Sequence, residues 1–185
     1  MKKAVFLDRD GTLNPDPGYI SDPNHFDLFP GVVEALKKIS QAGYELILIT
    51  NQSGIARGLI TFEQLDAIHD KLKKILAQGG VSLSAIYFCP HHPDFPPVNG
   101  ISRCDCRKPG PAMILQAIKE HQIDPAQSYM VGDKSSDIKL GYNAGVTPVF
   151  IGEKLPEGFE EVVAFSSLRD AADWIVADQQ QEKKL

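Results

Sequence analysis

The chain has 185 residues, 43% of them hydrophobic, and a formal net charge of −5 at pH 7. This length and apolar fraction suit one globular domain, and the mild acidity excludes a broad basic surface that would attract nucleic acid. The first apolar run ends at Asp8, too early for a signal peptide or a membrane span, and no other apolar stretch reaches membrane length. We therefore expect a monomeric cytoplasmic domain over 1–178, without membrane or nucleic-acid partners, and a frayed polar tail over 179–185.

Short apolar runs alternate with amphipathic stretches along the chain. The predicted strands cover 3–8, 44–50, 84–89, 128–132 and 147–151. The predicted helices cover 31–42, 61–78, 111–121, 135–144 and 167–177. Within 153–166, Pro156 and Gly158 indicate a loop, and Val162–Phe165 is a candidate edge strand. This alternation predicts an α/β fold, a three-layer Rossmann-like parallel sheet with helices on both faces.

The first predicted strand ends in two acids. Asp8 and Asp10 follow the apolar run Val5–Leu7, and Gly11 marks the turn. Both carboxylates can lean over one small site, although like charges held close repel unless a cation or a proton intervenes. A solvated acidic turn is the alternative interpretation of such a pair, and the residues at later strand ends argue against it.

Polar segments follow two other predicted strands in the same way. Thr50-Asn51-Gln52-Ser53-Gly54 comes after Leu46–Ile49, and Gly132-Asp133-Lys134 comes after Tyr129–Val131. Arg107-Lys108-Pro109 precedes a helical pattern that the prolines open. In an open α/β sheet, the carboxyl ends of the strands share one crevice, where ligands bind. Carboxylates, a hydroxyl and a cation gathered there suit phosphoryl transfer with a divalent metal.

Two long loops are expected beside this crevice. One covers 14–30 and contains four prolines, and the other covers 89–110. Long loops inside a compact domain are usually functional. Since no segment is long enough for a separate cap domain, we expect a capless protein whose two loops shape the substrate pocket.

All three cysteines fall in the second loop. Cys89 and His91 form Cys-x-His, and Cys104 and Cys106 form Cys-x-Cys about a dozen residues later. Three thiolates and one imidazole make the closed four-ligand set of a structural Zn²⁺ site, with His92 as the alternative imidazole. A Cys104–Cys106 disulfide is disfavoured by the short spacing, and a chance cluster of buried cysteines remains the other alternative.

These motifs together resemble those of the haloacid-dehalogenase-like phosphatases. The resemblance covers roughly residues 3–152, with the D-x-D-G-T motif, the strand-end Thr, the Lys and the G-D-K-x-x-D segment in the family's order. Within that family the chain is more similar to the D-glycero-D-manno-heptose bisphosphate phosphatases, and next to the histidinol-phosphate phosphatases. The segments that carry this closer resemblance are Asp8–Thr12, Pro17–Tyr19, Thr50–Gly58, Cys89–Pro93, Cys104–Pro109 and Gly132–Lys134.

The resemblance implies roles for the acidic residues and for one histidine. Asp8 would be the nucleophile that forms an aspartyl-phosphate, and Asp10 the general acid and later the base. Catalytic Mg²⁺ would bind the Asp8 side chain, the Asp10 backbone carbonyl and Asp133. His91 would complete the zinc site, which would pin the loop that ends in Arg107 and Lys108. Asp137 is expected at the start of a helix rather than on the metal.

The phosphoryl group would be bound by Thr50 and the amides after it, and neutralised by Lys108. The candidate substrate-binding residues are Asp16, Tyr19, Asn51, Gln52, Ser53, Arg57, Arg107, Lys108 and Lys134. Of these, Asp16 and Tyr19 rest on the resemblance alone. Arg107 would hold a phosphate in a bidentate fork, which a lysine cannot form, and an exposed surface cation is the alternative interpretation. Arg57 would contact a second phosphate or cap the next helix, and Lys134 would hold phosphate, tune Asp133 or be solvated.

We therefore expect a magnesium-dependent phosphatase acting on a small phosphorylated sugar. By resemblance, it removes the 7-phosphate of a heptose 1,7-bisphosphate during synthesis of ADP-heptose for lipopolysaccharide core, or of GDP-heptose. The alternatives are a histidinol-phosphate phosphatase, a polynucleotide 3′-phosphatase and a non-catalytic zinc-binding module. His25, His69 and His121 are expected to have no catalytic role, and Trp174 to pack the last helix against the sheet.

Overall fold

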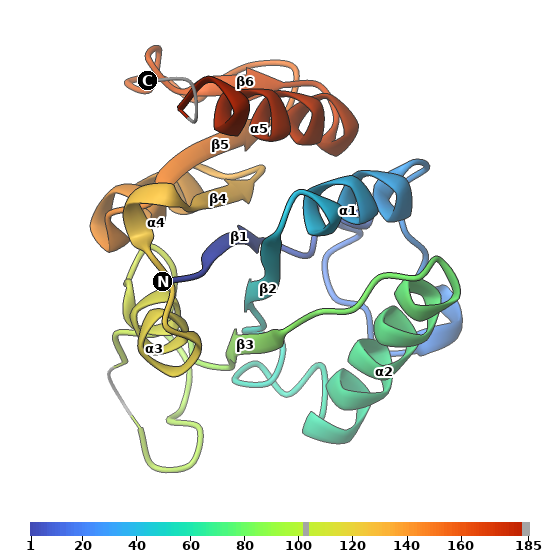
Figure 1. The fold of residues 1–185 in the computed structure, drawn as a ribbon. Coiled ribbons are helices and arrows are strands. Elements are labelled where there is room, and N and C mark those ends of the chain that lie inside the picture. Colours follow the sequence, from blue (N-terminus) through green and yellow to red (C-terminus); the bar gives the residue numbers. More distant parts are fainter. Residues whose placement is uncertain (102–103, 183–185) are drawn as a thin grey trace.

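A computed structural model describes residues 1–101 and 104–182 (Figure 1). In this part of the chain, six strands form one sheet with the order β3-β2-β1-β4-β5-β6, and each neighbouring pair is parallel. The strands are β1 (Lys3–Leu7), β2 (Tyr44–Asn51), β3 (Ala85–Cys89), β4 (Tyr129–Gly132), β5 (Thr147–Ile151) and β6 (Val163–Phe165). Each of the five predicted strands is present, and β6 is the candidate edge strand.

The helices lie where the amphipathic stretches predict them. They are α1 (Val32–Gln41), α2 (Phe62–Gln78), α3 (Ala112–His121), α4 (Ser135–Ala144) and α5 (Leu168–Glu182), with short 3₁₀ helices at Pro23–His25 and Pro125–Gln127. The prediction for the last helix was too short. It runs on to Glu182, through the start of the expected tail, of which 183–185 lie outside the described residues.

The sheet separates two apolar cores, because successive side chains of a strand point to opposite faces. On β1, Val5 and Leu7 belong to the core beneath α1, α2 and α5, whereas Ala4 and Phe6 belong to the core beneath α3 and α4. Trp174 of α5 packs edge-on against Tyr129, with ring centroids 5.8 Å apart, as predicted. The predicted three-layer arrangement is confirmed.

Parallel pairing brings the polar strand ends to one edge of the sheet. Leu7 lies opposite Leu48 of β2 on one side and Val131 of β4 on the other. The residues after these positions, Asp8, Thr50 and Asp133, therefore meet at this edge. Among the described residues, no helix is both long and apolar enough to cross a membrane.

Candidate active site

The centre of the site is a buried ion pair between Asp8 and Lys108. Lys108 Nζ donates to Asp8 Oδ1 at 2.6 Å and to the carbonyl of Ile49 at 3.2 Å. The same ammonium lies 2.7 Å from Asp137 Oδ1. Burial opposes the charge of Lys108, but the attraction of Asp137 and Asp8 outweighs it and holds the lysine pKa above its ordinary value. One buried cation thus serves two carboxylates.

The Asp8 carboxyl is crowded by other acids. Burial raises its pKa to about 7, Lys108 opposes that rise, and Asp137 and Asp133 add to it. Burial likewise raises the pKa of Asp133, and Asp137 contributes in the same direction. Carboxylate oxygens of Asp8, Asp133 and Asp137 lie within 4.8 Å of one another. Three acids facing one lysine leave excess negative charge, which a divalent cation with oxygen ligands would balance.

Two glycines allow these carboxylates to approach. A Cβ at Gly11 would lie 2.1 Å from Asp133 Oδ2, and one at Gly132 would lie 2.4 Å from Asp137 Cγ. Gly11 also has φ of +92°, a conformation that other residues rarely adopt. Asp137 accepts a hydrogen bond from the Lys134 amide at 3.0 Å, which is the helix-start role expected for it.

Asp10 has a different environment from Asp8, because hydrogen-bond donors surround it. Its two oxygens accept from Arg9 Nε at 3.1 Å and Arg9 Nη2 at 2.9 Å, from Asn14 at 2.9 Å and from Gln52 at 2.8 Å. Burial acts to raise the Asp10 pKa, but the Arg9 charge and these donors outweigh it and hold the pKa below its ordinary value. In the D-x-D motif, the surroundings of Asp8 thus favour its protonated form, and those of Asp10 favour its ionised form.

The segment after β2 supports both halves of this site. Gln52 donates to the Thr50 hydroxyl at 2.9 Å as well as to Asp10, so the amide links the two side chains. The Asn51 amide bonds to the main chain of Lys108 at both its N–H and its carbonyl. Gln52 and Asn51, predicted as substrate ligands, thus also hold catalytic candidates in place.

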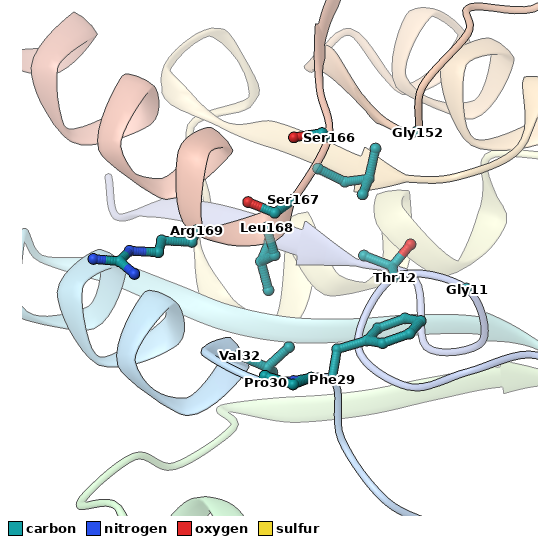
Figure 2. A pocket seen from close by; sticks show the side chains of 11 residues that line it. Gly11, Thr12, Phe29, Pro30, Val32, Gly152, Ser166, Ser167, Leu168 and Arg169 are labelled. Carbon is teal, nitrogen blue, oxygen red and sulfur yellow. The ribbon is translucent and has the colours of Figure 1, made fainter.

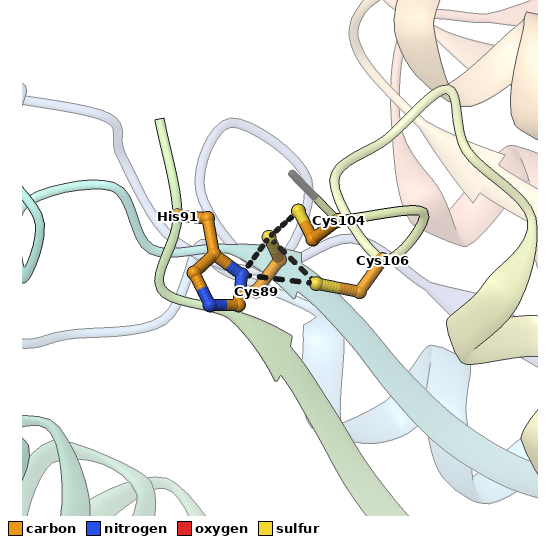
Figure 3. A group of neighbouring side chains, drawn as sticks. All are labelled: Cys89, His91, Cys104 and Cys106. Atoms are coloured by element: carbon orange, nitrogen blue, oxygen red, sulfur yellow. Dashed lines mark hydrogen bonds between the residues drawn. The ribbon is translucent and has the colours of Figure 1, made fainter. Parts of the chain in front are cut away.

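Cys89, His91, Cys104 and Cys106 converge at the carboxyl end of β3 (Figure 3). Cys89 Sγ lies 3.6 Å from Cys104 Sγ, and His91 Nδ1 lies 3.3 Å from Cys106 Sγ. Ligands of a tetrahedral zinc ion with bonds of about 2.3 Å to sulfur lie roughly 3.5–3.8 Å apart. The Sγ atoms of Cys106 and Cys89 lie closer, at 3.0 Å, and hydrogen bonding between them is the main factor that lowers the Cys106 pKa, which favours the thiolate form that zinc binds. The four side chains fit a zinc ion.

Arg57 and His92 contact each other. Arg57 Nη2 contacts His92 Nε2 at 2.9 Å, and its guanidinium lies 4.4 Å from the centroid of the Phe95 ring. Arg57 therefore contacts the 89–110 loop, called the zinc loop below because it contains the cysteine cluster, and it does not cap the next helix. The His92 side chain, which we expect to face solvent or the substrate if it is not a zinc ligand, is 13% exposed and lines a cavity beside Arg107 and Lys108. It packs edge-on against Phe95, with ring centroids 5.2 Å apart.

Two other predicted substrate ligands, Lys134 and Asp16, contact each other. Lys134 Nζ lies 2.8 Å from Asp16 Oδ2, so this pair ties the first long loop to the start of α4. Lys134 is thus paired in the free protein. Tyr19, from the same loop, lies 5.9 Å by its ring centroid from the Arg57 guanidinium.

Besides a cavity lined by Asp133 and the segment after β5, two further cavities lie near these residues. One of about 440 Å³ is lined by the zinc loop, Arg107 and Lys108. Arg107 is held there by a hydrogen bond to the His91 carbonyl at 3.2 Å. The other, of about 340 Å³, is lined by Gly11 and Thr12 together with the end of β5 and the start of α5 (Figure 2). Its lining includes no member of the acid–lysine cluster, whereas that of the first cavity includes Lys108.

Arg9 is a buried residue of the site that the sequence patterns did not single out, and its partner is His69. Arg9 is 1% exposed and bonds to Asp10, and Arg9 Nη1 lies 3.3 Å from His69 Nε2. His69 is buried on α2. Its spacing from Leu65 and Leu72 places it on the apolar face, and this was the available signal.

The fold and the acid–lysine cluster define a haloacid-dehalogenase-like hydrolase. A family model described as HAD-hydrolase-like matches residues 105–162. A structure of D,D-heptose 1,7-bisphosphate phosphatase from B. bronchiseptica, complexed with magnesium and phosphate, is 34% identical with a TM-score of 0.81, covering 95% of this chain and 99% of that chain.

Two sequence relatives identify the family to which the chain belongs within this class of hydrolases. The chain is 44% identical over 174 residues to the D-glycero-beta-D-manno-heptose-1,7-bisphosphate 7-phosphatase of Yersinia pestis, covering 94% of this chain and 89% of the relative. The protein of the same name from Haemophilus influenzae is 49% identical over 148 residues, with 79% of each covered. The chain belongs to this family of phosphatases. The predicted enzyme class, phosphoric monoester hydrolase, is thereby confirmed.

Proposed function

We propose that this protein removes the 7-phosphate of D-glycero-D-manno-heptose 1,7-bisphosphate. The product, a heptose 1-phosphate, would supply ADP-heptose for lipopolysaccharide core or GDP-heptose. One observation supports the proposal. This chain contains the acid–lysine cluster, and it aligns along 89% of a relative whose name states that activity. Retention of three crowded, mutually repelling acids, of which Asp8 and Asp137 are buried, is costly for a protein that only binds zinc.

The first chemical step is transfer of the phosphoryl group to Asp8. A carboxylate oxygen of Asp8 attacks phosphorus, and the bond from phosphorus to the sugar oxygen breaks. Asp10, which must be protonated in the substrate complex although it favours the ionised form in the free protein, gives its proton to that oxygen, which leaves as the 7-hydroxyl. Lys108 and the Thr50 hydroxyl neutralise and orient the phosphoryl oxygens, while the Ile49 carbonyl and Asp137 hold the ammonium in place.

The second step regenerates the enzyme. Asp10, now ionised, takes a proton from a water molecule that attacks the phosphorus of the aspartyl-phosphate. The bond from phosphorus to Asp8 breaks and inorganic phosphate leaves, with Asp10 protonated again. The donors around Asp10 favour its ionised form and so support its role as base in this step.

Mg²⁺ would be held by Asp8, Asp133 and the Asp10 backbone carbonyl, and would supply charge neutralisation between the nucleophile and the phosphate. The crowding of Asp8 and Asp133 supports this assignment, since burial and the neighbouring acids raise the pKa of both carboxyls despite the nearby lysines. Asp137 is already paired with Lys108, so we place it outside the metal's ligands.

The second phosphate would bind Arg107 in the cavity lined by the zinc loop. Arg107 can form a bidentate fork with a phosphate while one of its nitrogens is held by the His91 carbonyl. Zinc on Cys89, His91, Cys104 and Cys106 would keep the loop rigid, since all four positions would be filled and none would remain for water. Its contribution to catalysis would be the placement of Arg107 and Lys108.

The test is a phosphate-release assay with four substrates in the presence of magnesium. These are heptose 1,7-bisphosphate, heptose 7-phosphate, histidinol phosphate and a 3′-phosphorylated oligonucleotide. We expect the bisphosphate to have the highest kcat/KM, and the product to retain its anomeric phosphate by phosphorus NMR. Asp8→Asn is the control without a nucleophile. A preference for histidinol phosphate, or equal rates with and without the second phosphate, would refute the substrate.

A further inference from the structure

Arg9 links the D-x-D loop to α2 through contacts at both sides of its guanidinium. On one side, Nε and Nη2 donate to the two oxygens of Asp10 at 3.1 and 2.9 Å. On the other side, Nη1 lies 3.3 Å from His69 Nε2. Arg9 and His69 are 1% and 4% exposed, so water does not compete for these contacts.

The surroundings of His69 keep its imidazole neutral in this chain of contacts. Burial, together with the neighbouring Arg9 and Lys73, lowers the His69 pKa to about 4, while Asp10 and Asp70 oppose that shift. The imidazole is therefore neutral near pH 7, and its Nε2 accepts from Arg9 with the ring proton on Nδ1. In this chain of contacts, the full charge of Arg9 is balanced by Asp10 alone.

Aromatic rings limit the movement of both side chains. The Phe88 ring lies 6.0 Å from the His69 ring, and the Arg9 guanidinium lies 5.9 Å from the Phe26 ring. Two parallel N–H bonds to one carboxylate fix its plane as well as its position, which a lysine in place of Arg9 could not do. The Asp10 carboxylate is thus held in one orientation.

We propose that Arg9 and His69 are positioning residues for the reaction. His69 holds the Arg9 guanidinium, and Arg9 holds Asp10 in the orientation from which it protonates the leaving oxygen and later activates water. This inference rests on the proposed role of Asp10, but it does not depend on the identity of the sugar.

The dependence of rate on the leaving group separates this role from a general effect on the fold. 4-Nitrophenolate is stable as an anion and leaves with little need for a proton, whereas the more basic phenolate needs the acid. A misplaced Asp10 therefore slows phosphoryl transfer from phenyl phosphate more than from 4-nitrophenyl phosphate. A site that is merely loosened, or less of which is folded, slows both transfers by the same factor.

Three variants and a control make the test. His69→Leu removes the acceptor for Arg9 and keeps an apolar side chain on the buried face of α2, whereas His69→Gln keeps a side-chain acceptor. Arg9→Lys keeps the charge but loses the fork. The control is His121→Leu on α3, a helix histidine whose ring contacts Tyr87 instead. First-turnover rates are measured by rapid quench with both aryl phosphates, because later turnovers also depend on hydrolysis of the phosphoenzyme.

We expect His69→Leu to slow phenyl phosphate about tenfold and 4-nitrophenyl phosphate less than about threefold, because a small misplacement of a catalytic group is costly. His69→Gln should recover most of the loss. Arg9→Lys should slow phenyl phosphate by on the order of 10²-fold, near the usual contribution of a general acid. If Arg9→Lys does not fold, the His69 pair decides the result.

Equal slowing of both aryl phosphates, or unchanged rates in His69→Leu, would overturn the inference. A wild-type enzyme that turns over aryl phosphates but not heptose bisphosphate would refute the proposed substrate and leave this test valid. A wild type inactive on all of them would refute both.

Discussion

Asn51 holds the main chain of Lys108 on both sides of the residue. Its Oδ1 accepts from the Lys108 N–H at 3.0 Å, and its Nδ2 donates to the Lys108 carbonyl at 3.3 Å. The two residues come from β2 and from the segment after the zinc loop. This paired contact therefore sets where the Lys108 ammonium enters the cluster of acids.

Asn51→Ala should reduce kcat by about tenfold or more, because displacement of Lys108 weakens neutralisation of the phosphoryl group. Asn51→Asp is the matched variant, since it keeps the acceptor for the Lys108 N–H while it replaces the donor with a negative charge. It should retain more activity than Asn51→Ala. The measurement is steady-state kinetics with heptose bisphosphate, and equal activity of both variants and wild type would contradict the role.

Gly11→Ala should weaken magnesium binding, because its Cβ would displace the Asp133 carboxylate. Gly18→Ala is the matched control: Gly18 has φ of +104°, but nothing lies within 4 Å of the added Cβ. Both variants carry backbone strain of on the order of 1 kcal/mol, so both should lower Tm. Only Gly11→Ala should raise the magnesium concentration needed for half-maximal activity. Equal magnesium dependence of the two variants would show that Asp133 does not bind the ion.

Asp8 predicts how stability depends on pH. Its folded pKa of about 7 lies above the ordinary 3.8, so the folded state binds the proton more tightly than the unfolded state does. Asp8 therefore favours folding at low pH, and this contribution is lost as pH rises from about 4 to about 7. Without added magnesium, Asp8→Asn should become progressively more stable than the wild type across that interval, with a constant difference above it.

The comparison with Asp8→Asn is needed because His69 acts in the opposite direction. Its folded pKa of about 4 lies below the ordinary 6.5, so His69 makes the fold more stable as pH rises between those values. The difference in Tm between the two proteins cancels this contribution. Added magnesium should stabilise the wild type and not Asp8→Asn. A Tm difference that is independent of pH would contradict the raised Asp8 pKa.

Protein purified without a metal-affinity tag should contain one zinc per chain by elemental analysis. Cys104→Ser should lose zinc and speed amide hydrogen exchange in the loop between β3 and α3 more than in the sheet, because metal binding and local folding are coupled. Activity should fall as Arg107 and Lys108 are displaced. Asp94→Asn, an exposed substitution in the same loop, is the control and should keep zinc. Zinc-free wild-type protein with full activity would refute the site.

The helices, the strands and the residues at which the strands end can be predicted from the amino-acid sequence. Apolar runs and amphipathic spacing are properties of contiguous residues, so the strand that precedes Asp8 and the helix after Thr61 could be predicted directly. The Thr61–Gln64 capping box closes with bonds of 2.9 and 3.2 Å. The zinc cluster was predictable for the same reason, since Cys-x-His and Cys-x-Cys are short local patterns.

The side-chain contacts between those elements can be identified only in the tertiary structure. Arg9 and His69 are 60 residues apart, and Arg57 and His92 are 35 apart, so no local spacing relates them. Lys108 lies between Asp8 and Asp137 only because β1, β4 and the zinc loop meet at one edge of the sheet. Burial then sets the charges. The same low-dielectric surroundings that make His69 neutral also make Arg9 depend on Asp10, and neither effect can be read from the order of residues.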